Sequence, residues 1–199
     1  MSWILCRASQ SSSSREKKHK QGMSNKDMKG MIKLGPTGSQ TTGQAWDEKG
    51  QTHVYQILLS YEISKINGLQ IQYVKEGSSS LVLSDVFGSM SGPSFKSVKL
   101  DYPSEYLTWV KVQDGWNSID WVAFKTNLGK LHGPFPYWSG KVDDCVLATG
   151  FHLGDDDNQF GGFHGTADAN GLHSLGVYVR PVTSLKTNSA LKKHQQHQL

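Results

Sequence analysis

The chain of 199 residues contains only two cysteines, Cys6 and Cys145. Small secreted domains that depend on disulfides are far richer in cysteine, so this class is excluded and both thiols are expected to be free. No apolar run approaches the roughly 18 residues of a transmembrane segment. A signal peptide and an Asn-x-Ser/Thr sequon are missing too. The sequence therefore favours a cytoplasmic or nucleocytoplasmic protein that is not secreted.

Charge is scarce in the middle of the chain and unevenly distributed. Charged residues make up 19% of the sequence, which disfavours a long solvated helix, and the formal net charge is +4. Residues 1–31 carry +5 and residues 183–199 carry +3, whereas residues 32–182 hold 11 basic and 15 acidic residues and carry −4. A nucleic-acid groove needs Lys and Arg clustered on a fixed surface, so no specific nucleic-acid partner is expected for the acidic middle part.

The sequence lacks the common signatures of catalysis, cofactor binding and metal binding. In Gly88–Gly92 a methionine stands where a nucleophile elbow needs serine. Phosphate-binding and dinucleotide-binding glycine motifs are missing, and the eight histidines have no ligand spacing with cysteine. Asp155–Asn158 lacks the spacing of a calcium loop and is interpreted as an exposed acidic turn. We expect no catalytic residues, no metal and no cofactor, so a binding module fits better than an enzyme.

Alternating apolar residues and frequent turn signals predict an all-β protein. Glycine numbers 21 and aromatic residues make up 10% of the chain. Turns are expected at Ile66–Gly68, Gly92–Ser94 and Asn127–Gly129. Short strands at this spacing are typical of a sandwich, barrel or prism, and periodicity alone does not choose among them. The expected strands are Val54–Glu62, Leu69–Lys75, Ser80–Ser84, Phe95–Asp101, Leu107–Val112, Ile119–Thr126, Cys145–Thr149 and Ser174–Arg180.

These patterns divide the chain into three parts. Residues 1–31 form a basic, Ser-rich segment that we expect to be disordered, residues 32–182 form the domain, and residues 183–199 form a polar tail expected to be disordered. Cys145, beside two aliphatic residues, is interpreted as a buried small hydrophobe. Trp109, Trp116, Trp121 and Trp138 leave two interpretations open: a stacking platform for bases or sugars, or packing in the core and at its rim.

Several motifs of the middle part resemble the jacalin-related plant lectins. The quoted stretches are Gly35-Pro36, Trp46-Asp47, Asp101–Thr108, Thr126-Asn127, Gly133–Phe135, Gly162–Gly165 and Gly176–Pro181. They occur in family order from about Ile32 to Val182. Lys33–Pro36 and Gly161–Pro181 are most similar to family members associated with blocking long-distance movement of potyviruses.

The resemblance implies a β-prism of three four-stranded sheets with pseudo-threefold symmetry. Trp46 would then pack in the core, and Glu105 would accept backbone hydrogen bonds at a turn. Jacalin-type lectins often form homo-oligomers, so the resemblance allows one here. It also implies a non-enzymatic recognition protein in plant defence, antiviral in setting, that acts through protein partners.

The resemblance also locates a carbohydrate-binding site. It combines a glycine of the first loop, here Gly43, with a Gly-Asp-x-x-Asp segment before the last strand. In this chain Asn170 stands at the first aspartate and His173 at the second, with Gly171 between them. Gly43 and the backbone amides near Asn170 and Gly171 are expected to stay available for a sugar.

The histidine predicts a degenerate site. A carboxylate offers two charged acceptors, whereas neutral imidazole offers one and imidazolium none. Hydrogen bonds to a charged group contribute roughly 1.5–3 kcal/mol against about 1 kcal/mol for neutral ones. The loss corresponds to roughly tenfold to a hundredfold weaker binding. One hypothesis is therefore a scaffold with a decayed sugar pocket; the other is a cytoplasmic lectin that binds mannose- or glucose-type glycans weakly.

Overall fold

Strands with alternating inward and outward side chains make up most of the described structure. The computed structural model describes residues 30–49, 53–75, 78–154 and 159–181. In β3 (His53–Tyr61), Ile57 and Leu59 are buried, as the alternating sequence predicts, and Val54 is buried before a register shift between Val54 and Gln56. The other elements are β1 (Ile32–Gly38), β2 (Gln44–Glu48), β4 (Ile66–Val74), β5 (Leu81–Leu83), β6 (Phe87–Gly88), β7 (Ser94–Lys99), β8 (Leu107–Asp114), β9 (Ile119–Thr126), β10 (Leu131–Phe135), the short 3-10 helix η1 (Val142–Asp144), β11 (Thr149–His152), β12 (Phe160–Asp168) and β13 (Gly171–Val179).

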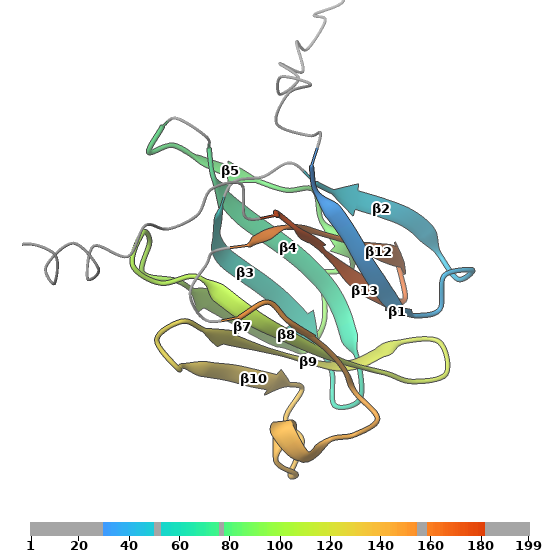
Figure 1. The fold of residues 1–199 in the computed structure, drawn as a ribbon. Coiled ribbons are helices and arrows are strands. Elements are labelled where there is room, and N and C mark those ends of the chain that lie inside the picture. Colours follow the sequence, from blue (N-terminus) through green and yellow to red (C-terminus); the bar gives the residue numbers. More distant parts are fainter. Residues whose placement is uncertain (1–29, 50–52, 76–77, 155–158, 182–199) are drawn as a thin grey trace, which may run out of the picture.

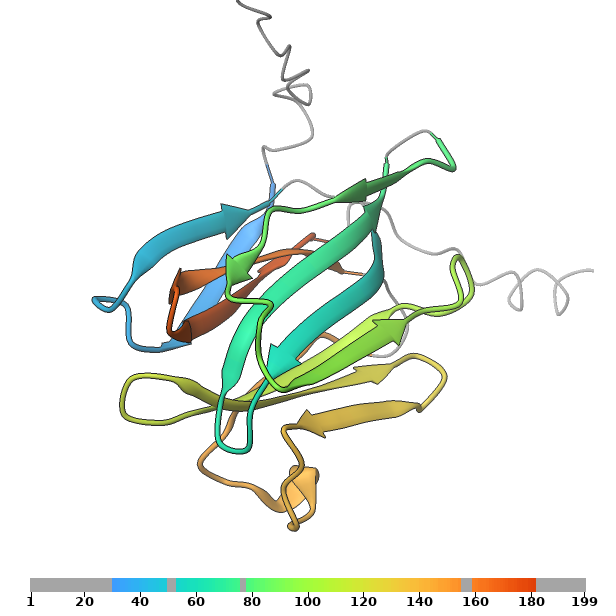
Figure 2. The ribbon, with the colours of Figure 1, turned by 180° about the vertical axis from the view of Figure 1, so that it is seen from behind.

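The strands form three antiparallel sheets, as Figures 1 and 2 show from opposite sides. Sheet A has the order β1-β13-β12-β2, sheet B the order β5-β4-β3-β7 and sheet C the order β10-β9-β8-β11. In sheet B the short strand β6 also pairs with β4, along Gly68–Leu69, while β5 pairs with Gln72–Val74. Two short strands thus share the fourth position, and each sheet has four strand positions. The predicted β-prism is confirmed.

Each sheet repeats one plan. Two central strands form a hairpin, β12–β13 in sheet A, β3–β4 in sheet B and β8–β9 in sheet C, and an edge strand flanks each side. The core lies between the three sheets and takes side chains from all of them, for example Ile71, Phe124 and Val177. A loop at a hairpin tip of one sheet therefore comes close to loops of the other two, and this closeness positions the candidate site.

The structure describes both residues to which the resemblance assigns a structural role, Trp46 and Glu105. Glu105 is buried, and its Oε2 accepts a hydrogen bond from the Asp101 amide at 3.0 Å, which confirms the expected turn. Trp46 is only half-buried; it packs against the core and stacks on Phe87 with 4.0 Å between ring centroids. Trp46 therefore covers the edge of the core at β2, the edge strand of sheet A.

Some sequence predictions were wrong in detail. Cys145–Ala148 is a turn, and the strand begins only at Thr149. Cys145 is half-buried: it packs against the cluster of Trp121, Ala123 and Val142, its Sγ lies 3.4 Å from Gln113 Oε1, and the aliphatic residues after it are exposed. Ile66–Gly68 belongs to β4, because Ile66 is a core residue that pairs with Tyr61.

Other predictions concern residues beyond those that the structure describes. The terminal segments expected to be disordered lie outside them, apart from residues 30 and 31. Cys6 and the acidic turn at 155–158 also lie outside them. Among the residues that the structure does describe, no helix has both the length and the apolar character needed to cross a membrane.

Candidate carbohydrate site

A pocket of about 420 Å³ lies at the end of sheet A where four loops meet, one of which is the β3–β4 turn with Lys65. The β12–β13 turn contributes Asn170 and Gly171, and His173 follows in β13. The β1–β2 connection contributes Thr42. The tip of the β8–β9 hairpin contributes Trp116, whose side chain is 95% exposed. The structure therefore brings three of the four predicted site residues into one pocket.

Gly43, the fourth predicted residue, packs behind the pocket. It adopts φ +75°, a conformation that favours glycine. A Cβ atom there would lie 2.7 Å from the Ala167 carbonyl oxygen and 2.9 Å from Cδ2 of His173. The glycine therefore lets the β1–β2 connection approach the histidine closely.

Both ring nitrogens of His173 face groups of the protein. Nδ1 lies 2.6 Å from the carbonyl oxygen of Asn117, which can only accept, so Nδ1 carries a proton. Nε2 lies 2.9 Å from Asp168 Oδ1, within ion-pair distance, although the approach is oblique and leaves Nε2 without an aligned acceptor. With Nδ1 donating to the Asn117 carbonyl oxygen, only Nε2 is left to meet a ligand, and Nε2 lies against the Asp168 carboxylate.

Asp168 is occupied as well. Its Oδ1 also accepts the Asn170 amide at 2.7 Å. The contact with His173 and this amide together lower the pKa of the Asp168 carboxyl from its usual value. The prediction that the Asn170 amide is available was therefore wrong, because the preceding aspartate already binds it. On the other side of the turn, Lys65 Nζ donates to the Asn170 carbonyl oxygen at 2.9 Å and lies 3.2 Å from Glu62 Oε1.

Sequence reasoning missed Asp168, Lys65, Asn117 and Trp116 as pocket residues. Asp168 pairs with Gly171 across a two-residue turn. The string Asp168–Gly171 carries a turn signal that would have placed the aspartate at the pocket edge. The other three come from sheets B and C, and no local pattern brings them to sheet A.

Three antiparallel sheets arranged as a prism, with a loop pocket at the end of one sheet, define a lectin-type β-prism. The chain belongs to the jacalin-related lectin family, since the Jacalin-like lectin domain matches residues 34–178. It is 40% identical over 164 residues to both Protein RESTRICTED TEV MOVEMENT 1 and Inactive protein RESTRICTED TEV MOVEMENT 1 of Arabidopsis thaliana, covering 77% of this chain and 90% of each relative.

A solved structure of single-chain recombinant jacalin has the same fold. Its TM-score is 0.63 at 26% identity, and the match covers 76% of this chain and 95% of that one. The match supports the prism architecture described above over most of the described residues.

Proposed function

We propose that this chain is a non-enzymatic recognition protein of plant defence that acts through protein partners in the cytoplasm or nucleocytoplasm and restricts systemic virus movement. One observation carries the sugar-independent part of this proposal: the polar groups of the sheet A pocket bind one another. His173 faces Asp168 and Asn117, and Asp168 holds the Asn170 amide. A sugar would have to displace these contacts before it gained its own. The likeness to the RESTRICTED TEV MOVEMENT 1 proteins supports the antiviral setting.

Calorimetry on the full chain tests the sugar-independent part. We expect no heat of binding from mannose, glucose, galactose or oligomannose up to tens of millimolar. Saturable binding that is lost when Asn170 or Gly43 is changed would contradict a decayed pocket. His173→Asp is the informative variant: it restores two carboxylate acceptors, and a gain of affinity would show that the histidine alone silences the site.

The antiviral part needs a separate measurement in plants. Plants that lack this protein should allow a potyvirus to reach distant leaves sooner than matched plants that carry it. Unchanged systemic spread, with the protein shown to be present in the control plants, would contradict this part and leave the pocket result untouched.

One observation favours a second candidate, a lectin for mannose- or glucose-type glycans. The sheet A pocket remains an open cavity of about 420 Å³, and the exposed Trp116 offers an indole face at its rim. Sugars commonly stack their apolar faces on aromatic rings. The same titrations decide between the two candidates.

A further inference from the structure

A second pocket, of about 390 Å³, lies at the end of sheet C near the tip of its central hairpin. The first pocket lies at the corresponding end of sheet A. The second pocket is bounded by the end of the β8–β9 hairpin, the connection from β10 to β11 and the β3–β4 turn. Its lining includes Trp121, Tyr137 and Trp138, with Asp120 as the one carboxylate. We name it the aromatic pocket.

Asp120 occupies the position in sheet C that His173 occupies in sheet A. Each follows a core residue near the start of the second hairpin strand: Ile119 precedes Asp120, and Leu172 precedes His173. The repeated plan of the sheets therefore puts a carboxylate where sheet A has an imidazole. Ser118 Oγ donates to Asp120 Oδ1 at 3.0 Å, and Oδ2 has no hydrogen bond from the described residues.

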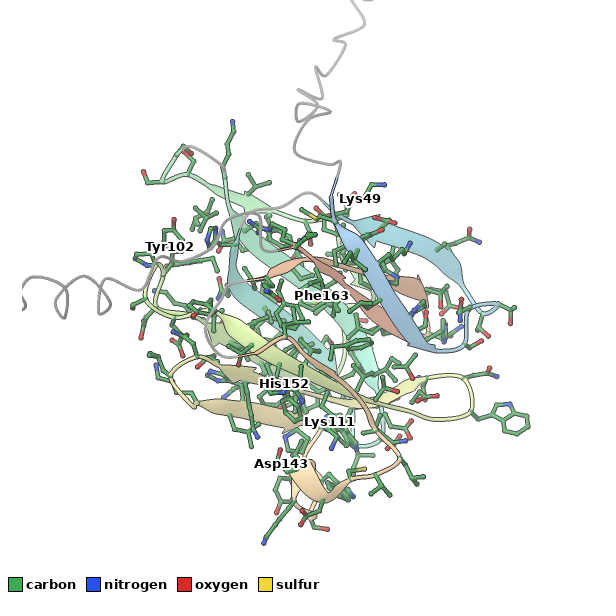
Figure 3. The ribbon with its side chains drawn as sticks, viewed as in Figure 1. Lys49, Tyr102, Lys111, Asp143, His152 and Phe163 are labelled. Atoms are coloured by element: carbon green, nitrogen blue, oxygen red, sulfur yellow. The ribbon has the colours of Figure 1, made fainter. Side chains whose placement is uncertain are left out.

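The aromatic residues are held in place from behind. The rings of Trp121 and Trp138 stack with centroids 5.9 Å apart and 15° between their planes. Lys111, a buried lysine of β8, donates from Nζ to the Val142 carbonyl oxygen at 2.7 Å and to that of Asp143 at 3.2 Å. Figure 3 shows Lys111 close to Asp143, which belongs to the short helix η1. The pocket wall is therefore anchored to the sheet rather than loosely attached.

The rim of the aromatic pocket is apolar and faces solvent. Ile63 is 94% exposed, Tyr137 83% and Leu147 80%, and all three line the pocket. Val146, next to Leu147, is 92% exposed. Exposed apolar side chains gathered around one cavity are typical of an interaction surface, whereas single ones scattered over a surface need no explanation.

The chemistry of the lining selects a cation. Aromatic faces carry negative potential and attract ammonium and guanidinium groups, and Asp120 adds a full negative charge. None of the lining residues is Lys, Arg or His. Two lysines of adjoining elements are engaged elsewhere: Lys65 with Asn170 and Glu62, and Lys125 with Asp143 at 2.7 Å. Lys141, in the connection from β10 to β11, does not line the pocket.

A neutral sugar fits this lining less well. Ser64, Tyr137 and the tryptophans carry donors for sugar hydroxyls, but a neutral sugar gains only hydrogen bonds from Asp120, whereas a cation also gains from its full charge. Gln113 is partly engaged: its side-chain amide donates to the Asp114 carbonyl oxygen at 2.8 Å, and its Oε1 lies 3.4 Å from Cys145 Sγ. A cationic side chain needs only acceptors and aromatic faces, which the aromatic pocket supplies.

We infer that the aromatic pocket binds a lysine or arginine side chain that a partner protein presents within an apolar segment. The cationic group would lie between Asp120 and the rings of Tyr137 and Trp138, since Trp121 is buried and stacks on Trp138. The flanking apolar residues would cover Ile63 and Leu147. The inference rests on the proposed function, because it gives the protein partner of that proposal a chemistry. It does not involve the sheet A pocket.

The test follows the indole N–H signals of the full chain by NMR, with Trp138→Phe used to assign them. The probes are acetylated, amidated pentapeptides of sequence Ser-Leu-Lys-Leu-Ser and Ser-Leu-Arg-Leu-Ser, with norleucine replacing the cationic residue as the control. We expect saturable shifts of the Trp121 and Trp138 signals with the cationic peptides only. Asp120→Asn should weaken binding roughly tenfold, and Asp85→Asn, at an exposed aspartate of the loop after β5, should not change it.

Four results would overturn the inference. Equal shifts with the norleucine peptide would show an apolar surface without cation selectivity. Shifts with methyl α-mannoside that Asp120→Asn abolishes would make the pocket a sugar site. The absence of a shift with either cationic peptide would show that the pocket does not bind a lysine or arginine side chain. Movement of the pocket signals in ligand-free protein on changing Lys17, Lys18 and Lys20 to alanine would assign the pocket to the chain's own basic segment. Sugar titrations of His173 variants are independent of all four.

Discussion

Asp168 and His173 close the sheet A pocket from within: Oδ1 of the aspartate lies 2.9 Å from Nε2 of the histidine. When the polar groups of a pocket contact one another, the pocket can keep its shape and still have few free donors and acceptors for a ligand. The Asn170 amide, held by the same carboxylate at 2.7 Å, extends this internal pairing to the backbone. In sheet C, by contrast, the carboxylate of Asp120 keeps one oxygen free of hydrogen bonds within the described residues.

The tight approach of Gly43 to the pocket predicts a large effect of a single methyl group. Gly43→Ala would place Cβ 2.7 Å from the Ala167 carbonyl oxygen in a backbone with φ +75°. We expect a loss of about 2–3 kcal/mol in the free energy of unfolding, from backbone strain together with the steric clash. Urea denaturation measures it. Gly129→Ala is the matched control, since φ is +73° there and no atom lies within 4 Å of the new Cβ. An equal loss in both variants would show that strain alone acts at Gly43.

Glu105 is the buried carboxylate on which the turn before β8 depends. Oε2 accepts the Asp101 amide at 3.0 Å, Oε1 accepts Thr126 Oγ1 at 3.0 Å, and Lys130 Nζ lies 3.1 Å from Oε2. Glu105→Ala leaves the Asp101 amide and the Thr126 hydroxyl without this acceptor and is expected to cost about 2–3 kcal/mol in urea denaturation. Glu62→Ala, at an exposed ion pair, should change stability by less than about 1 kcal/mol. Comparable losses in the two variants would contradict a special role for Glu105.

The same glutamate predicts a pH dependence. Burial alone would raise its pKa, but the Asp101 amide, Lys130 and Thr126 outweigh burial and hold the pKa below its ordinary value of 4.5. Because the folded pKa is lowered, the stabilisation is present above pH 4.5 and is lost as pH falls through the folded pKa. The free energy of unfolding of Glu105→Gln should therefore decline less steeply below pH 4.5 than that of the unchanged protein. Parallel curves would contradict this assignment.

Lys111 anchors the wall of the aromatic pocket, so its loss should loosen one segment rather than the whole domain. Lys111→Met keeps the apolar stem but removes the donor to the carbonyls of Val142 and Asp143. We expect faster amide hydrogen exchange in residues 136–148 and unchanged exchange in the hairpin β12–β13. Lys125→Met is the matched control, since its ion pair with Asp143 is more exposed. Uniformly faster exchange along the chain would show a global effect instead.

The sequence indicated the central strands except β12 and missed most edge strands outside sheet B, for identifiable reasons. β1 and β10 each contain Gly-Pro, which argues against a strand in the middle of a sheet. Both are edge strands, and each ladder shifts register across its Gly-Pro, between Leu34 and Thr37 and between His132 and Phe135. Proline is tolerated there because an edge strand and a bulge do not need every amide. The glycine-rich β12 was missed because it has too few large side chains to show alternation.

The sequence predicted residues of the candidate site but not the contacts that these residues make with other sheets. Resemblance brought Gly43, Asn170 and His173 together, and the structure places them around one pocket or directly behind it. The pairing that occupies His173 depends on Asn117, which arrives from sheet C, 56 residues earlier in the chain. The aromatic pocket depends in the same way on loops of two sheets, so its tryptophans stayed ambiguous between core packing and a binding surface.

His164 provides a further pH test, at neutral rather than acidic pH. The side chain is 1% exposed in the centre of sheet A, and Nε2 lies 3.0 Å from the Leu34 carbonyl oxygen, which requires a proton on Nε2. Burial lowers the pKa of His164 below its ordinary value of 6.5, and the hydrogen bond to Leu34 only partly offsets this. The unfolded chain therefore takes up a proton first as pH falls below 6.5, and the folded protein loses stability until the folded pKa is passed.

His164→Gln keeps an N–H donor but cannot take up a proton, so its free energy of unfolding should fall less between pH 7.5 and pH 5 than that of the unchanged protein. Urea denaturation at both pH values measures the difference. The other histidines are the same in both proteins and cancel from the comparison. Lys33 and Asp47, the charged groups that face His164, are also unchanged. A fall in stability of the same size in both proteins would show that His164 is not the residue that makes the folded domain sensitive to mild acid.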